Sequence, residues 1–394
     1  MASVLLQFLT PPSVNLSPDY EGTEYRWKFL TIRPAFFKNE PYFIAVILFF
    51  AVFYLWGKRV NARRANKCCL GKRLTVPHAP RFQAHLPLLE SQFSKPVAPN
   101  GLIRDGNSDW FNFSTGRRAV SSLHTTIALR PRHDLLQYAY QIGRGLVELN
   151  YTAHDAVELD FTFNAGAAAG AVPDCVWAVV AKDDMKGIRA RRWDLTFTKT
   201  TDQPPLPPAL TVMSEFADVT ATLLKPLGAL DLPAVLSDPA ALKYFRSLSI
   251  TDQPRTRPSA PLPQSQRTKH VILELTVPPP SDAAATLPLV QAAFQLVDAV
   301  AGEGRASGLR GGLAAQLRPE TKSKLKKYRE QVEKEIREEA KREQKEEEEE
   351  KRVAAKRKAE EERLSKLSAA EQKKALDREK KRAMRKTQTR MKVR

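Results

Sequence analysis

The run Tyr42–Gly57, YFIAVILFFAVFYLWG, determines how this chain is organised. It contains no charged residue, and Lys58 follows it directly. As a helix it would be about 25 Å long, close to the roughly 27 Å hydrocarbon core of a thin bilayer. We therefore predict one transmembrane helix over residues 41–57, with these side chains in or beside lipid: Tyr42, Phe43, Ile44, Val46, Ile47, Leu48, Phe49, Phe50, Val52, Phe53, Leu55 and Trp56.

Two other interpretations compete with a membrane span. A run of this length is also found in buried core helices and in the apolar region of signal peptides. A core helix of a soluble protein normally has a polar stripe, and this run is apolar on every side. A cleaved signal would begin nearer Met1 and end in small residues.

The flanking charges predict the orientation of the span. Basic residues are more frequent after it than before it, and no acid lies between residues 58 and 77. The positive-inside rule places a luminal tail at 1–40 and the rest of the chain in the cytosol. We expect a linker at 58–78 that rests on anionic headgroups; its basic residues are Lys58, Arg59, Arg63, Arg64, Lys67, Lys72 and Arg73.

Composition limits the remaining possibilities. The net charge of +19 indicates a polyanionic partner, either nucleic acid or anionic lipid. All 3 cysteines fall on the predicted cytosolic side, so no disulfide framework is expected. Cys68 and Cys69 are either palmitoylation sites or two reduced thiols in the linker. Asn15 opens a glycosylation sequon, and a glycan there would settle the topology.

Hydrophobic periodicity predicts a cytosolic α+β domain over residues 79–317. A Pro-rich joint near 204–208 would divide it into two lobes. The expected helices are 81–95, 132–148, 211–225, 239–245 and 287–300, and the expected strands are 120–130, 157–163, 176–181, 193–199 and 270–277.

Residues 318–372 are dominated by Glu, Lys, Arg and Ala. A narrow apolar seam does not continue beyond Ala340, whereas a coiled coil needs apolar positions over three or four heptads. We therefore expect a long solvated helix supported by Glu–Lys pairs four residues apart. The alternatives are a helical hairpin and a partly disordered tail. The seam consists of Leu325, Tyr328, Val332, Ile336 and Ala340.

The segment 373–394 is strongly basic, with Asp377 and Glu379 as its only acids. Such a terminus suits phosphate contacts that are independent of base sequence and sensitive to salt. A nuclear localisation signal and a membrane-surface helix are the other interpretations. The candidate RNA-binding residues are Lys373, Lys374, Lys380, Lys381, Arg382, Arg385, Lys386, Arg390, Lys392 and Arg394.

No catalytic motif stands out. The sequence has no His-Glu-x-x-His, Cys-x-x-Cys, P-loop or Gly-x-Ser-x-Gly pattern. Its 6 histidines are scattered without metal-ligand spacing. We expect a protein that is not an enzyme and needs no metal or cofactor; an enzyme would require an enclosed polar pocket in the cytosolic domain.

Several short stretches, in this order, resemble the calumin-type coiled-coil domain proteins, a ribosome-contacting subunit of the PAT complex. No single motif is specific, but together they are spread along residues 41–394. They are Pro41–Ile44, Asp134–Leu136, LPPALTVMSEFADV (206–219), SLSITDQ (247–253), VILELTVP (271–278) and the terminal Met391–Val393.

This resemblance implies a non-enzymatic protein of the endoplasmic reticulum membrane that sits beside the protein-conducting channel. Its C-terminal helices would reach ribosomal RNA near the exit tunnel, and a small multispanning Asterix-type subunit would supply a chaperone surface for nascent multipass proteins. The animal family's long acidic luminal segment is missing, so we do not transfer its calcium role. The alternative is a membrane tether whose basic arm binds anionic lipid or another protein.

Overall fold

We analysed a computed structural model of the 394-residue chain. The structure describes residues 23, 25–27, 30–32, 40–69, 103–115, 119–148, 151, 153–164, 170–261, 267–279, 281–302 and 311–365. Asn15, the expected helix 81–95 and the basic segment 373–394 lie outside the described residues.

The apolar run belongs to one long helix, α2 (Glu40–Cys69). Its Pro41–Ala65 segment is long and apolar enough to cross a membrane, and the most apolar part of it is only 6% buried. A second helix, Ala284–Ala301, meets the same length and composition criteria but is 61% buried, as expected of a core helix. Before α2, the described residues include a short antiparallel pair, β1 (Tyr25–Trp27) and β2 (Leu30–Ile32).

A nine-stranded antiparallel sheet forms the centre of the protein, in the order β3-β4-β5-β6-β11-β10-β7-β9-β8. Strands from both sides of residues 204–208 alternate in this one sheet, so that segment is a turn between two strands and does not separate two lobes. The strands are β3 (Ile103–Asp105), β4 (Asp109–Ser114), β5 (Val120–Ala128), β6 (Ala156–Phe163), β7 (Trp177–Ala181), β8 (Lys199–Thr201), β9 (Leu210–Ser214), β10 (Phe245–Thr251) and β11 (His270–Thr276).

Strand β5 confirms the predicted alternation. Leu123, Thr125 and Ile127 are buried, whereas His124 and Thr126 are exposed. The predicted strands at 157–163, 176–181 and 270–277 are also present, as β6, β7 and β11.

The helix predicted over 211–225 is wrong in its first half. Residues Leu210–Ser214 form β9, which pairs with β7 and β8, and the helix α6 begins only at Ala217. Every residue of β9 is buried, so the strand shows no alternation of apolar and polar positions. Val212 and Phe216 therefore have helical spacing by coincidence.

The strand predicted over 193–199 is also wrong. Trp193–Phe197 form a 3-10 helix, η2. The hydroxyls of Thr196 and Thr198 donate to the carbonyls of Trp193 and Leu195 at 2.6 and 2.7 Å, which favours a tight turn over an extended chain.

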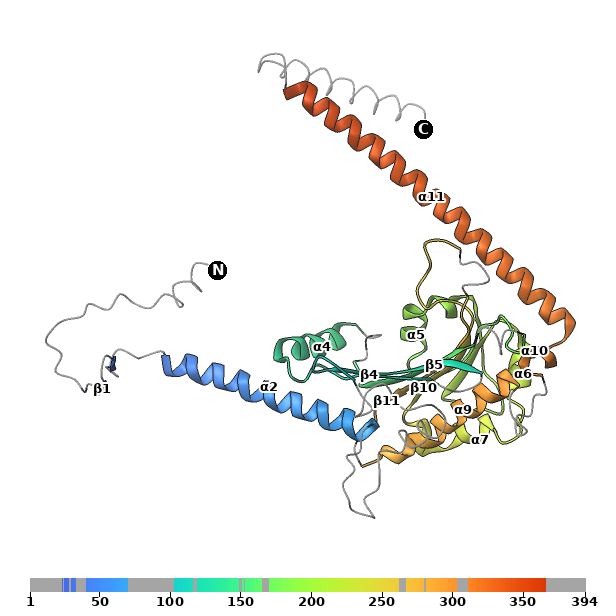
Figure 1. The fold of residues 1–394 in the computed structure, drawn as a ribbon, viewed down its shortest axis with the longest axis horizontal. Coiled ribbons are helices and arrows are strands. Elements are labelled where there is room, and N and C mark those ends of the chain that lie inside the picture. Colours follow the sequence, from blue (N-terminus) through green and yellow to red (C-terminus); the bar gives the residue numbers. More distant parts are fainter. Residues whose placement is uncertain are drawn as a thin grey trace.

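Helices cover the two faces of the sheet (Figure 1). The larger core lies on one face, under α9, whose Phe294 ring meets Phe161 of β6 edge to face at 5.0 Å. A smaller cluster under α5 and η2 covers part of the other face. The connecting helices are α4 (Leu135–Val147), α5 (Met185–Arg191), α6 (Ala217–Leu223), α7 (Leu232–Ser237), α8 (Pro239–Leu242), η4 (Ala283–Thr286), α9 (Leu287–Ala301) and α10 (Leu313–Gln316).

The last described element is the helix α11 (Pro319–Ser365), 47 residues and therefore about 70 Å long. It leaves the end of the sheet opposite α2 and projects away from the domain (Figure 1). The predicted apolar seam is confirmed, but its partner is the domain: Leu325, Val332 and Ile336 are buried against it.

Candidate membrane-facing and arm-anchoring sites

The C-terminal end of the apolar run packs directly on the sheet domain. Gly57 is buried, and a Cβ there would collide with the backbone carbonyl of Arg132. Tyr54, one turn earlier, lies edge-on to the ring of His133 at 5.9 Å and accepts a hydrogen bond from Asn107 at 3.1 Å. Glycine therefore allows a close approach that any side chain would prevent.

A buried carboxylate, Asp155, joins α2 to the sheet. Its oxygens accept two hydrogen bonds from Arg132 at 2.9 and 2.7 Å, and Arg64 of α2 donates a third. The amide of Arg130 donates a further one at 2.9 Å. Burial raises the pKa of Asp155, but these hydrogen bonds and the two guanidinium charges outweigh it and hold that pKa below its usual value.

Asn61, one turn after Gly57 on α2, adds two hydrogen bonds to this contact. Its side-chain amide donates to the carbonyl of Arg130 at 2.8 Å, and its oxygen accepts from Arg132 at 3.1 Å. We name Gly57, Asn61, Arg64, Arg132 and Asp155 the span joint. The prediction of a linker is therefore wrong for residues 58–69, since this segment is helical and its start is fixed to the domain.

The basic residues predicted to follow the membrane have different environments around the span joint. Arg64 is used inside the joint, whereas Arg59 and Arg63 are exposed on the helix. Lys58 lies over the ring of Tyr54, 6.0 Å from its centroid. Lys72 and Arg73 lie outside the described residues, as does the side chain of Lys67.

Next to the span joint, α4 exposes apolar side chains. Asp134 caps the helix by accepting from the amides of Leu136 and Gln137, both at 3.0 Å. Leu136 is 74% exposed and Val147 83% exposed, and no residue of α4 is buried. The helix predicted over 132–148 is confirmed, but its apolar face has no cover in the described part of the chain.

At the other end of the sheet, Arg329 anchors α11. Its guanidinium donates to Glu215 at 2.7 and 2.8 Å and to Asp252 at 2.7 and 2.8 Å. All three side chains are at least 96% buried, with exposures of 4%, 2% and 1%. The two carboxylates outweigh the effect of burial and raise the pKa of Arg329, whereas burial raises that of Glu215.

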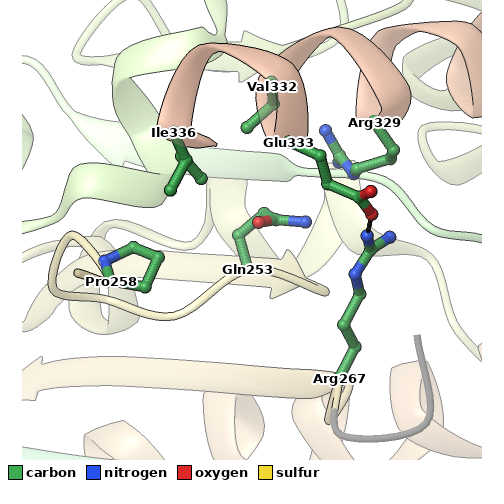
Figure 2. Close-up of a pocket in the computed structure, with 7 residues that line it drawn as sticks. All are labelled: Gln253, Pro258, Arg267, Arg329, Val332, Glu333 and Ile336. Carbon is green, nitrogen blue, oxygen red and sulfur yellow. Dashed lines mark ion pairs between the residues drawn. The ribbon is translucent and has the colours of Figure 1, made fainter. Parts of the chain in front are cut away.

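Figure 2 shows the surroundings of this anchor. Val332 and Ile336 of α11 lie above Gln253 and Pro258, and Arg267 pairs with Glu333 at one side. The crevice between them has a volume of about 10 Å³, the space of about one water molecule. We name Glu215, Asp252 and Arg329 the arm anchor.

The position of Arg329 in the sequence already indicates the arm anchor. Arg329 lies four residues after Leu325 and three before Val332, so it falls on the same stripe as the apolar seam. A charged residue on a buried stripe requires partners, but its two carboxylates lie more than 70 residues away in the chain.

Beyond the anchor, Val332 and Ile336 are still buried, but every residue from 341 to 355 is exposed. Ion pairs four residues apart support the helix. Examples are Lys334–Glu338 at 3.9 Å, Arg342–Glu346 at 3.4 Å and Lys351–Glu347 at 3.2 Å. This part matches the expected solvated helix. Among the described residues, no group of three or more His, Cys, Asp or Glu side chains is placed to hold a metal ion.

Comparison with known proteins agrees with this architecture. Residues 36–386 match the model of the family described as PAT complex subunit CCDC47. A relative, an endoplasmic reticulum membrane protein of the UPF0674 group from Schizosaccharomyces pombe, is 28% identical over 188 residues. That alignment covers 43% of this chain and 47% of the yeast protein, so the chain spans about half the length of this curated relative. Since the family model covers most of the sequence, the chain belongs to the PAT complex subunit CCDC47 family.

Proposed function

We propose that this chain is a non-enzymatic biogenesis factor of the endoplasmic reticulum membrane, which binds the ribosome and the protein-conducting channel. The observation that carries the proposal is the family match over residues 36–386. The yeast relative's description as an endoplasmic reticulum membrane protein supports the location. With a small multispanning Asterix-type partner, the chain would act as an intramembrane chaperone for the insertion and folding of nascent multipass proteins.

The arrangement of the helices supports a bridging role. The span candidate and the charged arm leave opposite ends of one sheet (Figure 1). Each is fixed to it by an arginine of the helix that pairs with a buried carboxylate of the domain. With the N-terminal tail luminal and residues after 57 cytosolic, α11 would carry the basic segment 373–394 to ribosomal RNA near the exit tunnel. Phosphate contacts of that kind are strong at low salt and weaken steeply as salt rises.

The exposed apolar face of α4 supports a domain held against the bilayer. This helix follows Arg132 and His133, which touch α2 at Gly57 and Tyr54, where the apolar run ends. Isolated exposed leucines are ordinary, but a helix with several is typical of membrane surfaces. In this proposal α4 lies at the cytosolic surface of the membrane that α2 crosses.

Deleting residues 373–394 from the full chain tests ribosome binding. Detergent-solubilised membranes are sedimented, and the fraction of the protein that travels with ribosomes is measured between low and high salt. The deletion is expected to lower that fraction, and the intact chain should lose it steeply with salt. The control is Lys322→Gln with Lys326→Gln, which removes two exposed charges from the arm but leaves the basic segment intact.

Unchanged sedimentation after the deletion would contradict ribosome binding by this segment. Binding of the deleted segment to anionic vesicles, together with unchanged ribosome association, would favour the membrane tether instead. A protease-protection result with both ends of the chain on one side of the membrane would contradict the single-span arrangement.

A further inference from the structure

The helix α2 has two different sides where it leaves the apolar run. With 3.6 residues per turn, the residues of the span joint on α2 lie on one side. The opposite side is a continuous stripe made of Val52, Leu55, Trp56, Arg59 and Arg63. Every member of this stripe is exposed, whereas Gly57, Asn61 and Ala65 on the other side are buried. We name these five exposed residues the outer stripe.

The outer stripe changes from apolar to basic along its length. A hollow of about 350 Å³ runs beside it, lined by Val52, Leu55, Trp56, Arg59, Val60 and Arg63. Neither Arg59 nor Arg63 has an acidic partner within the described part of the chain. Both side chains are exposed among the described residues, which leaves their guanidinium groups accessible to an anion.

The depth of these residues fits a lipid headgroup. Trp56 is a residue type that prefers the boundary between hydrocarbon and headgroups. Arg59 lies about 4.5 Å and Arg63 about 10 Å further along the helix axis. The headgroup layer is about 5 to 8 Å thick on each side of the bilayer, so the two arginines bracket its outer part, where phosphates and carboxylates lie.

We propose that the outer stripe binds an anionic phospholipid. The acyl chains would pack along Val52 and Leu55, and the headgroup phosphate would accept hydrogen bonds from Arg59 and Arg63. Arginine suits this role because its planar guanidinium binds phosphate through two parallel hydrogen bonds. This site does not depend on ribosome binding, and it separates the basic residues after the span into lipid-binding and joint-forming ones.

Native mass spectrometry of the purified full chain in detergent tests the proposal without ribosomes. Equal amounts of phosphatidylserine and phosphatidylcholine are added, and the ratio of phosphatidylserine-bound to phosphatidylcholine-bound protein is measured. The wild-type chain is expected to retain phosphatidylserine preferentially. The double variant Arg59→Gln/Arg63→Gln should reduce that preference on the order of fivefold for each arginine, and higher salt should reduce it in the wild type.

Two controls make the result specific. The variant Lys322→Gln/Lys326→Gln removes two exposed charges with the same four-residue spacing from α11 and should leave the preference unchanged. Arg64→Gln should also leave it unchanged, because Arg64 faces Asp155. The proposal is overturned if the wild type shows no preference, or if the double variant keeps it. It is also overturned if the double variant loses a co-purifying membrane protein while its lipid preference persists.

Discussion

The span joint and the arm anchor each attach a projecting helix to the sheet domain, with the roles of arginine and carboxylate exchanged. At the span joint two arginines, Arg64 and Arg132, share one carboxylate, Asp155. At the arm anchor one arginine, Arg329, is shared by Glu215 and Asp252. In each case an arginine of a projecting helix reaches into the sheet domain and pairs with carboxylate there.

The two attachments differ in how far they exclude water. The arm anchor is almost fully buried, whereas the side chain of Arg64 is 31% exposed. The span joint relies as well on the close approach at Gly57. A buried ion pair costs most when one partner is removed, and an exposed pair contributes little. The comparison therefore predicts that loss of the helix's own arginine costs much more at the arm anchor than at the span joint.

The largest effect is expected from Arg329→Gln. It leaves Glu215 and Asp252 buried without a countercharge, which should lower the free energy of unfolding by about 3 to 5 kcal/mol. Hydrogen exchange of residues 319–340 should rise, because α11 loses its anchor. The control Lys334→Gln removes a charge that is 77% exposed on the same helix; equal exchange in both variants would contradict the anchor.

The arm anchor also shows which contacts of α11 could be predicted from the sequence and which could not. The apolar seam predicted that one side of α11 is covered, because side chains three and four residues apart share a face. It could not identify the cover as the domain, since a narrow apolar stripe is equally suited to a second helix. The partners of Arg329, Glu215 and Asp252, directly follow β9 and β10. No local pattern links segments so distant in sequence.

The same limit explains the errors in the sheet. Strands with one exposed face, such as β5, alternate and were predicted. Strand β9 is buried throughout and lacks a regular alternation, and its segment is predicted as helix. Strand β10 is not predicted although residues 247–251 alternate polar and apolar; in the fold both kinds of side chain are buried. At the span joint, the basic residues after the run predicted orientation, but not that Arg64 is turned inward while Arg63 is turned outward.

The second largest effect is expected from Asp155→Ala, about 3 kcal/mol, since it removes charge-assisted hydrogen bonds from two arginines. The pKa of Asp155 is lowered in the folded chain. Its contribution is therefore present above the unfolded pKa of about 3.9 and lost as pH falls through the lower folded value. Unfolding followed from pH 6 to pH 2.5 should show that loss in the wild type and lack this component in the variant; identical profiles would contradict the assignment.

A smaller effect, about 1 to 3 kcal/mol, is expected from Gly57→Val. The added side chain meets the backbone of Arg132, so α2 must separate from the domain. The measurement is the efficiency of a cysteine cross-link between Asn61 and Asn107, which the wild-type contact between these residues places close together. Ala51→Val, on an exposed part of the same helix, is the matched control. Unchanged cross-linking in Gly57→Val would show that the close approach is not needed.

The smallest effect concerns two adjacent arginines. Arg64→Gln should lower the free energy of unfolding by no more than about 1 kcal/mol, because its ion pair with Asp155 is partly exposed and Arg132 still neutralises the carboxylate. Arg63→Gln should leave stability unchanged, since that side chain points away from the domain. Chemical unfolding of both variants in the same detergent measures the difference. If Arg63→Gln is the more destabilising of the two, then the side of α2 that faces the sheet has been wrongly assigned, and the span joint with it.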